Sequence, residues 1–294
     1  MNDIQLENML DEARNLVEHG KRLHAMQVYH RILEAEPRSF EAALELSALF
    51  IESGRTQGAE DVLRRVYERS GKDPKILFML GSLYLRKGEF EKAITFYKML
   101  GNRRSPEVHF NMGIAYFYKN SIKLAEHHLR LTMKYDPRFP RINESIGELL
   151  IKKRAFAEAI TYLKRGLQSD PNSCVNHYLL GVAHAHLFDW KNAYESFVTA
   201  VEMDPKEVSA WQMCGRALLH LGRLNEAEQY LRKAYDLNPH MPDTLVDLGN
   251  LHLQRRSTET AVQFFDKALE FDPANPGARD GKLKVKLLTR KRTS

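Results

Sequence analysis

Apolar residues recur along this chain with the spacing of an α-helical face, and residues 208–241 show the pattern most clearly. In this stretch Trp211, Cys214, Gly215 and Leu218 fall at i, i+3, i+4 and i+7, which places them on one side of a helix. We therefore predict a helix here with Trp211 in its core stripe.

A second stripe with the same spacing follows Gly222, which is expected to end the first helix. Its members are Leu224, Ala227, Leu231 and Ala234. Small residues at Gly215 and Ala227 allow two antiparallel helices to pack closely where they cross. Pro239 then ends the second helix, because proline lacks the backbone N–H and clashes with the preceding turn. The pattern predicts a helical hairpin.

The same hairpin pattern recurs at intervals of 34 residues. The closing prolines are Pro137, Pro171, Pro205, Pro239 and Pro273. The crossing glycines in register with them are Gly113, Gly147, Gly181, Gly215 and Gly249. The small residues of the second helices are Ala125, Ala159, Ala193, Ala227 and Ala261. One hairpin cannot bury both of its faces, so such units are expected to stack on their neighbours.

This spacing resembles the tetratricopeptide repeat, a 34-residue helix–turn–helix unit. The resemblance implies an all-α, right-handed superhelix, or α-solenoid, of about eight repeats. The repeats are expected at residues 6–39, 40–73, 74–105, 106–139, 140–173, 174–207, 208–241 and 242–275. Residues 276–294 are expected to form a C-terminal capping helix and a basic tail, in which Leu283, Leu287 and Leu288 cover the open end of repeat eight.

The joints between the early repeats depart from this pattern in a readable way. Repeat three has 32 residues and lacks the proline, so its second helix is expected to end with Gly101 as a left-handed cap. Ser105-Pro106 and Asp73-Pro74 each supply a side-chain cap followed by a first-turn proline. Gly71 stands where proline would be, which predicts a looser joint between repeats two and three.

Charge is unevenly distributed along the chain. Residues 276–294 hold seven Lys and Arg against one Asp, so this segment accounts for the whole net charge of +6. The remaining residues are balanced, which disfavours nucleic-acid binding by the array. The chain shows no apolar run of membrane-spanning length and no opening signal peptide. Its two cysteines fit a reduced, cytoplasmic protein better than a disulfide scaffold.

No motif of catalysis or cofactor binding is present in the sequence. We therefore predict that the chain is not an enzyme and takes no cofactor, metal or small-molecule substrate. Among the twelve histidines, His177 and His184 share a helical face. They occupy the core stripe, however, so we interpret them as packed core residues rather than metal ligands.

The opposite face of each first helix, formed by the second, fifth, ninth and twelfth positions, lines the concave groove in this family. The resemblance therefore implies a peptide-binding groove in repeats three to six, with Phe78, Phe110, Asn111, Ile114, Tyr118, Arg141, Tyr178 and Val182. The acidic end of the groove, in repeats one and two, is expected at Glu7, Asp11, Glu41 and Glu45. The twelfth position is apolar in all eight repeats, which is typical of packing between repeats. The fifth position is apolar in six of the eight, so a partly structural role is the alternative interpretation of Phe78 and Phe110.

Some members of the family grip C-terminal carboxylates with a clamp of five polar side chains. Only Asn111 and Arg141 match that clamp here, so it is not expected. The chain is predicted to be a non-catalytic scaffold or adaptor that binds a protein or peptide. The alternatives are a regulatory or docking subunit of an enzyme complex, such as a glycosyltransferase or secretion assembly, and polyanion or membrane-surface binding through the basic tail.

Overall fold

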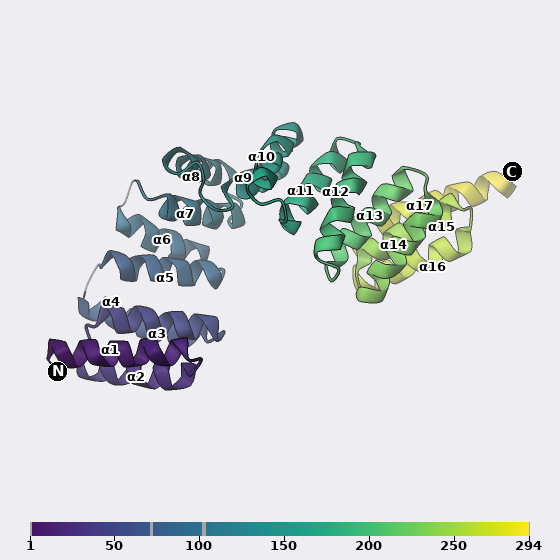
Figure 1. Ribbon diagram of the computed structural model, residues 1–294. Coiled ribbons are helices and arrows are strands. Elements are labelled where there is room, and N and C mark those ends of the chain that lie inside the picture. Colours follow the sequence, from purple (N-terminus) through teal and green to yellow (C-terminus); the bar gives the residue numbers. More distant parts are fainter. Residues whose placement is uncertain (1, 71–72, 102–103, 294) are drawn as a thin grey trace. The chain divides into compact units, whose positions relative to one another are not determined.

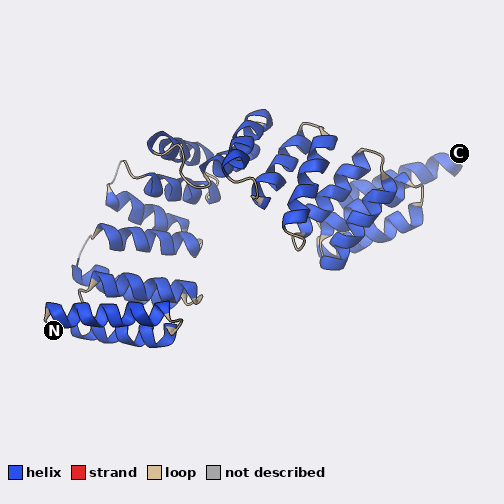
Figure 2. Cartoon of the chain, in the orientation of Figure 1, coloured by secondary structure: helices blue, strands red, loops and turns tan. Residues whose placement is uncertain are grey.

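The computed structural model describes residues 2–70, 73–101 and 104–293, and all regular elements among them are α-helices (Figure 2). The predicted loose joint at Gly71 lies outside the described residues. The chain divides into two compact units, residues 1–142 and 143–294. No described helix is both long and apolar enough to cross a bilayer.

Each unit is a stack of helices that follow one another in chain order (Figure 1). The helices of unit 1 are α1 (Asp3–Glu18), α2 (Arg22–Ala35), α3 (Phe40–Glu52), α4 (Thr56–Ser70), α5 (Pro74–Arg86), α6 (Phe90–Leu100), α7 (Pro106–Tyr118) and α8 (Ile122–Tyr135). The helix α9 (Ile142–Lys152) begins at the boundary. Unit 2 continues with α10 (Phe156–Ser169), α11 (Cys174–His186), α12 (Trp190–Met203), α13 (Val208–His220), α14 (Leu224–Leu237), α15 (Pro242–Gln254), α16 (Thr258–Phe271) and α17 (Pro276–Thr293).

The predicted crossing points explain why the helices pair. A Cβ atom added to Gly215 would lie 2.5 Å from Cγ of Leu231, and one added to Gly181 would lie 2.6 Å from the Phe197 ring. Both distances are far shorter than a van der Waals contact. Glycine is therefore required at these positions because the partner helix fills the space beside the backbone. The all-α fold of paired helices is confirmed.

The predicted caps at the irregular joints are present. Asp73 accepts hydrogen bonds from the backbone N–H of Lys75 at 2.8 Å, and Ser105 accepts one from Val108 at 3.3 Å. Gly101 ends α6 in the left-handed conformation, with φ of 58°. These local sequence signals therefore position α5 and α7 correctly although repeat three is short.

Two expectations about packing were wrong. Leu283, Leu287 and Leu288 are exposed, and α17 instead buries Ala278, Gly281 and Val285 against α15 and α16. The buried residues fall at i, i+3 and i+7, so the small residues rather than the leucines define the packed stripe. Trp211 is only half-buried, because its Nε1 donates to the carbonyl of Pro205 at 3.0 Å and holds the ring at the surface.

Candidate functional site

An open, mostly apolar recess of about 550 Å³ lies among the first helices of repeats two to four, all within unit 1. Residues of α3, α5, α6 and α7 and of the turn before α7 surround it. They are Leu44, Glu45, Ala48, Pro74, Lys75, Phe78, Met79, Leu100, Ser105 and Val108. The recess combines an apolar floor with polar groups at its rim, which is the usual character of a binding pocket.

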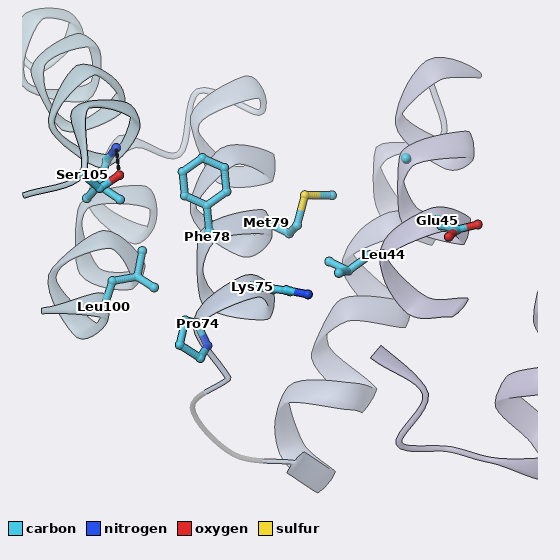
Figure 3. Close-up of a pocket in the computed structure, with 10 residues that line it drawn as sticks. Leu44, Glu45, Pro74, Lys75, Phe78, Met79, Leu100 and Ser105 are labelled. Atoms are coloured by element: carbon cyan, nitrogen blue, oxygen red, sulfur yellow. Dashed lines mark hydrogen bonds between the residues drawn. The ribbon is translucent and has the colours of Figure 1, made fainter. Parts of the chain in front are cut away.

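The helix α5 forms the centre of this recess (Figure 3). Met79 and Lys75 project from it toward Leu44 and Glu45 of α3, whereas Phe78 faces Leu100 and Ser105. The Phe78 ring contacts the buried Tyr97 ring edge to face, with 5.9 Å between centroids. Such a contact fixes the orientation of Phe78, so the recess has a rigid aromatic wall.

A buried hydroxyl lies behind this wall. Burial raises the pKa of Tyr97 to about 12, although hydrogen bonds with Ser82 and Asn111 oppose the increase. Asn111, which was predicted to face the groove, is half-buried and supports Tyr97 in this way. The side chains that shape the recess are therefore held by polar contacts beneath its surface.

Charges at the rim are distributed asymmetrically. Lys75 is exposed, and no carboxylate of the described residues lies within ion-pair distance of its ammonium group. On the other side, Arg14 of α1 binds Glu45 at 2.8 Å, Glu41 at 3.1 Å and Asp11 at 3.5 Å. Hydrogen bonding to Glu45, aided by Glu41, raises the pKa of Arg14 above its ordinary value. One arginine thus partly neutralises the predicted acidic end.

The acidic end also borders a second recess, of about 470 Å³, which shares Lys75 with the first. Its acidic lining consists of Asp3, Glu7, Glu36, Glu41 and Asp73, and its basic lining of Arg38 and Lys75. Carboxylates outnumber cations, so this recess favours a positively charged group.

The other predicted groove residues of unit 1 lie outside the apolar recess. Phe110 is half-buried and packs on Phe139, with 4.9 Å between ring centroids. Ile114 is half-buried on the same helix. Tyr118 is the exposed last residue of α7, and its ring stacks on Phe90 with 5.3 Å between centroids.

Arg141 is exposed and precedes α9 with φ of 62°. The predicted residues of unit 2, Tyr178 and Val182, are half-buried and pack against a core that includes Phe197. Burial raises the pKa of Tyr178.

Sequence reasoning missed a buried polar network on the corresponding face of unit 2. Arg216 of α13 donates through Nε to both carboxylate oxygens of Asp247 of α15, at 3.1 and 3.0 Å, and Gln212 donates to the same carboxylate. The Asp247 side chain is only 4% exposed. Burial raises its pKa, and Arg216 opposes that effect.

The two histidines assigned to the core stripe are hydrogen-bonded. His184 is buried and its Nδ1 lies 3.0 Å from Asp189, while Nε2 of the half-buried His177 lies 3.1 Å from the carbonyl oxygen of Pro171. Within the described residues no three His, Cys, Asp or Glu side chains cluster as a metal site would require.

Sequence reasoning also missed Leu44, Ala48, Lys75 and Met79 as lining residues of the apolar recess. Leu44 and Ala48 occupy the fifth and ninth positions of repeat two, and Lys75 the second position of repeat three. The signal was present in the repeat register, because these positions share the face that predicted Phe78. Reading repeat two only for its acidic residues concealed it.

Comparison with family models identifies the class of protein. Two models described as tetratricopeptide repeat match residues 10–74 and 110–173, and residues 50–109 and 222–284. A third, described as anaphase-promoting complex, cyclosome, subunit 3, matches residues 152–234. The repeat models together cover more than half of the chain. The chain belongs to the tetratricopeptide repeat family.

Individual relatives are distant. The chain is 23% identical to the BBSome complex member BBS4 of Bos taurus, over 91% of this chain and 60% of that protein. It is 23% identical to anaphase-promoting complex subunit 3 of Schizosaccharomyces pombe, over 73% of this chain and 33% of that protein. The crystal structure of the APC/C hetero-tetramer Cut9-Hcn1 is similar in fold, with a TM-score of 0.70 and 14% identity over 97% of this chain and 57% of that one. The chain thus spans only part of the proteins it resembles.

Proposed function

We propose that the chain is a non-catalytic scaffold or adaptor that binds a segment of a partner protein in the apolar recess of unit 1. The observation that carries this proposal is the open recess around Phe78 and Met79. Large apolar side chains that stay accessible on a concave face usually mark a contact site. Few residues carry most of the energy of such contacts, and aromatic anchors in pockets are typical of them.

Charge at the rim limits the chemistry of the bound segment. The side chain that enters the recess is large and apolar. A basic residue of the segment lies toward Glu7 and Glu41, and an acidic residue meets Lys75, which is not paired within the described structure. These charged contacts contribute orientation and association rate more than affinity. Within unit 1, Phe110 and Ile114 stay part of the proposal as an extension of this site. Tyr178 and Val182 stay a separate proposed contact surface of unit 2.

The division into eight repeats with a capping α17 also stands as our prediction, as does a cytoplasmic location. The similarity to a BBSome complex member and to an anaphase-promoting complex subunit supports a role as a subunit of a larger protein assembly. This favours the subunit alternative over an adaptor that acts alone.

Site-specific crosslinking tests the site. A photoreactive side chain is placed at Met79 and, as the matched control, at the exposed Leu124 on α8. We expect only the Met79 probe to crosslink one defined peptide of a copurifying protein. The synthetic peptide should then compete with the crosslink and bind the purified chain.

A cavity-filling pair tests whether the recess itself is used. Ala48→Phe fills the recess, and Ala35→Phe adds the same ring at an exposed position of α2. Ala48→Phe should weaken binding of the synthetic peptide by about tenfold or more, whereas Ala35→Phe should not. If both variants are folded and bind equally well, the partner uses another surface.

A further inference from the structure

The turn between the two helices of each hairpin contains one residue with positive φ, between 60° and 75°, at the same position of the repeat. In unit 1 these residues are Gly20, Gly54, Gly88 and Asn120. In unit 2 they are Arg154, Phe188, Gly222 and Arg256. Glycine and asparagine adopt this conformation readily, whereas a bulky side chain there is strained.

Phe188 combines this strain with exposure to solvent, since 79% of the residue is accessible. Gly222 forms the same turn in the next hairpin, so the fold does not require a side chain there. Strained residues that persist in a structure tend to lie at functional positions. Phe188 is therefore displayed at the tip of its turn at a cost to stability.

The turns of unit 2 form one continuous surface, which we name the turn edge: residues 152–157, 186–191, 220–225 and 254–259. Side chains connect each turn to the next. Phe156 stacks on His186 with 4.4 Å between ring centroids, and Trp190 stacks on His220 at 3.8 Å. Arg255 donates to Asn225 at 2.8 Å. Each of these turns therefore lies beside the next one along the chain.

Charge on the turn edge is positive. Its residues include seven Lys and Arg against Asp189 and Glu259. Arg223 pairs with Glu226 and Arg255 with Glu228, so the positive charge of this edge rests on the remaining cations. Asp189 already accepts hydrogen bonds from Asn192 and contacts His184. Among the described residues, no carboxylate lies within ion-pair distance of Arg154, Lys191 or Arg256. Leu187 and Leu221, both exposed, also belong to the turn edge.

We propose that the turn edge of unit 2 docks on an anionic lipid bilayer. In this arrangement Phe188 and Leu187 enter the headgroup layer, while Arg154, Lys191 and Arg256 contact lipid phosphates and carboxylates. Apolar side chains surrounded by cations bind such interfaces through burial and electrostatic attraction together. The apolar groups stand on the tips of turns rather than in a recess, which suits a broad, deformable surface better than a peptide.

Vesicle flotation of the full chain tests the proposal. Wild-type protein should float with phosphatidylcholine vesicles that contain phosphatidylserine, and much less with phosphatidylcholine alone. Phe188→Asn should reduce binding by about tenfold, because asparagine keeps the turn but removes the apolar side chain. Leu237→Asn, at an exposed leucine at the end of α14, is the matched control and should bind like wild type.

Charge variants distinguish membrane binding by the turn edge from binding by the C-terminal tail. Arg154→Gln combined with Arg256→Gln should lower binding by at least about tenfold and flatten its salt dependence. The corresponding Gln variant of Arg290, Lys291 and Arg292 should retain binding. Three results would overturn the proposal: no vesicle binding by wild type, unchanged binding of Phe188→Asn, or loss that follows only the tail variant. Binding to heparin without binding to vesicles would identify a polyanion or acidic-protein surface instead.

Discussion

Both units contain the same ion pair in the same register, but in different surroundings. In unit 1 Arg14, at the ninth position of repeat one, binds Glu45, at the sixth position of repeat two. In unit 2 Arg216, at the ninth position of repeat seven, binds Asp247, at the sixth position of repeat eight. The Glu45 side chain is 31% exposed and that of Asp247 only 4%.

The difference arises from what fills the face beside each pair. In unit 1 the residues next to Glu45 leave the apolar recess open, so water still reaches the carboxylate. In unit 2 Gln212 covers Asp247 and supplies a further hydrogen bond. A buried carboxylate depends on its partners, because it has lost its hydration, whereas an exposed pair contributes little to stability. The same repeat position is therefore open to solvent in unit 1 and buried in unit 2.

Replacing the acidic member of each pair should give the largest difference between the units in the free energy of unfolding. Asp247→Ala leaves Arg216 and Gln212 without their acceptor and should lower the free energy of unfolding by about 3–5 kcal/mol. Glu45→Ala should lower it by less, about 1–2 kcal/mol, because its pair with Arg14 is exposed and the main loss is the acceptor of the buried Tyr29 hydroxyl. Urea unfolding followed by circular dichroism measures both, and hydrogen exchange should localise the first loss to α13–α16.

A double variant serves as the control for this contrast. Arg216→Met with Asp247→Leu removes both charges and should recover much of the lost stability, because no charge stays buried without a partner. Equal losses for Asp247→Ala and Glu45→Ala would contradict the comparison.

Lowering the pH should destabilise unit 1 by a smaller amount than loss of Asp247 destabilises unit 2, through a close pair of imidazoles in unit 1. Nδ1 of His109 lies 3.0 Å from Nδ1 of His128. Burial, together with His109, His127 and Lys98, lowers the pKa of His128 to about 4. The folded chain keeps His128 neutral, while the unfolded chain takes up a proton below its ordinary pKa of about 6.5. Stability from this residue is therefore complete above that pH and falls as the pH drops toward 4.

Between pH 7 and pH 5 this effect, reduced by solvent screening of the half-buried ring, amounts to about 1 kcal/mol. Urea unfolding at the two pH values should show the loss in wild type, and His128→Gln should reduce it. His24→Gln, at an exposed position of α2, is the control and should leave the pH dependence unchanged. A pH dependence that is the same in all three proteins would refute this assignment.

The smallest expected effects concern the turns. Phe188→Gly should raise the free energy of unfolding by about 1 kcal/mol, because glycine relieves the left-handed strain. Gly54→Ala, with φ of 75° and no atoms near an added Cβ, should lower it by a similar amount. Thermal unfolding of the two single variants measures the signs, which should be opposite. Destabilisation by Phe188→Gly would show that the ring packs rather than protrudes.

Local rules made the fold readable from sequence. The register of glycine, alanine and proline predicted the hairpins, because each of these residues is needed for packing or helix termination within its own repeat. Gly215, for example, leaves room for Leu231 of the partner helix. Asp73 and Ser105 predicted helix starts for the same reason. The family and its all-α class followed from these signals.

The surface was less predictable because it depends on neighbours from different repeats. The apolar recess takes Leu44 from α3, Met79 from α5 and Val108 from α7. A stripe read along one helix does not say which of these residues stay accessible. Leu283 illustrates the opposite error, since it was expected to cover the end of repeat eight and is exposed. The residues at the turn position of each repeat can be read from the sequence register. That they adopt positive φ, and that Phe188 is strained there, required the backbone angles.

The short sequence separation of the helix contacts also affects how the chain folds during synthesis. The extensive helix contacts join elements no more than two apart in the chain, such as α7 with α8 or α13 with α15. Contacts of short sequence separation close small loops, so folding does not wait for distant segments to meet. A chain leaving the ribosome can complete each hairpin on the one before it, because every new hairpin finds its packing surface already formed. The growing chain thus exposes at most one unfinished apolar face at a time.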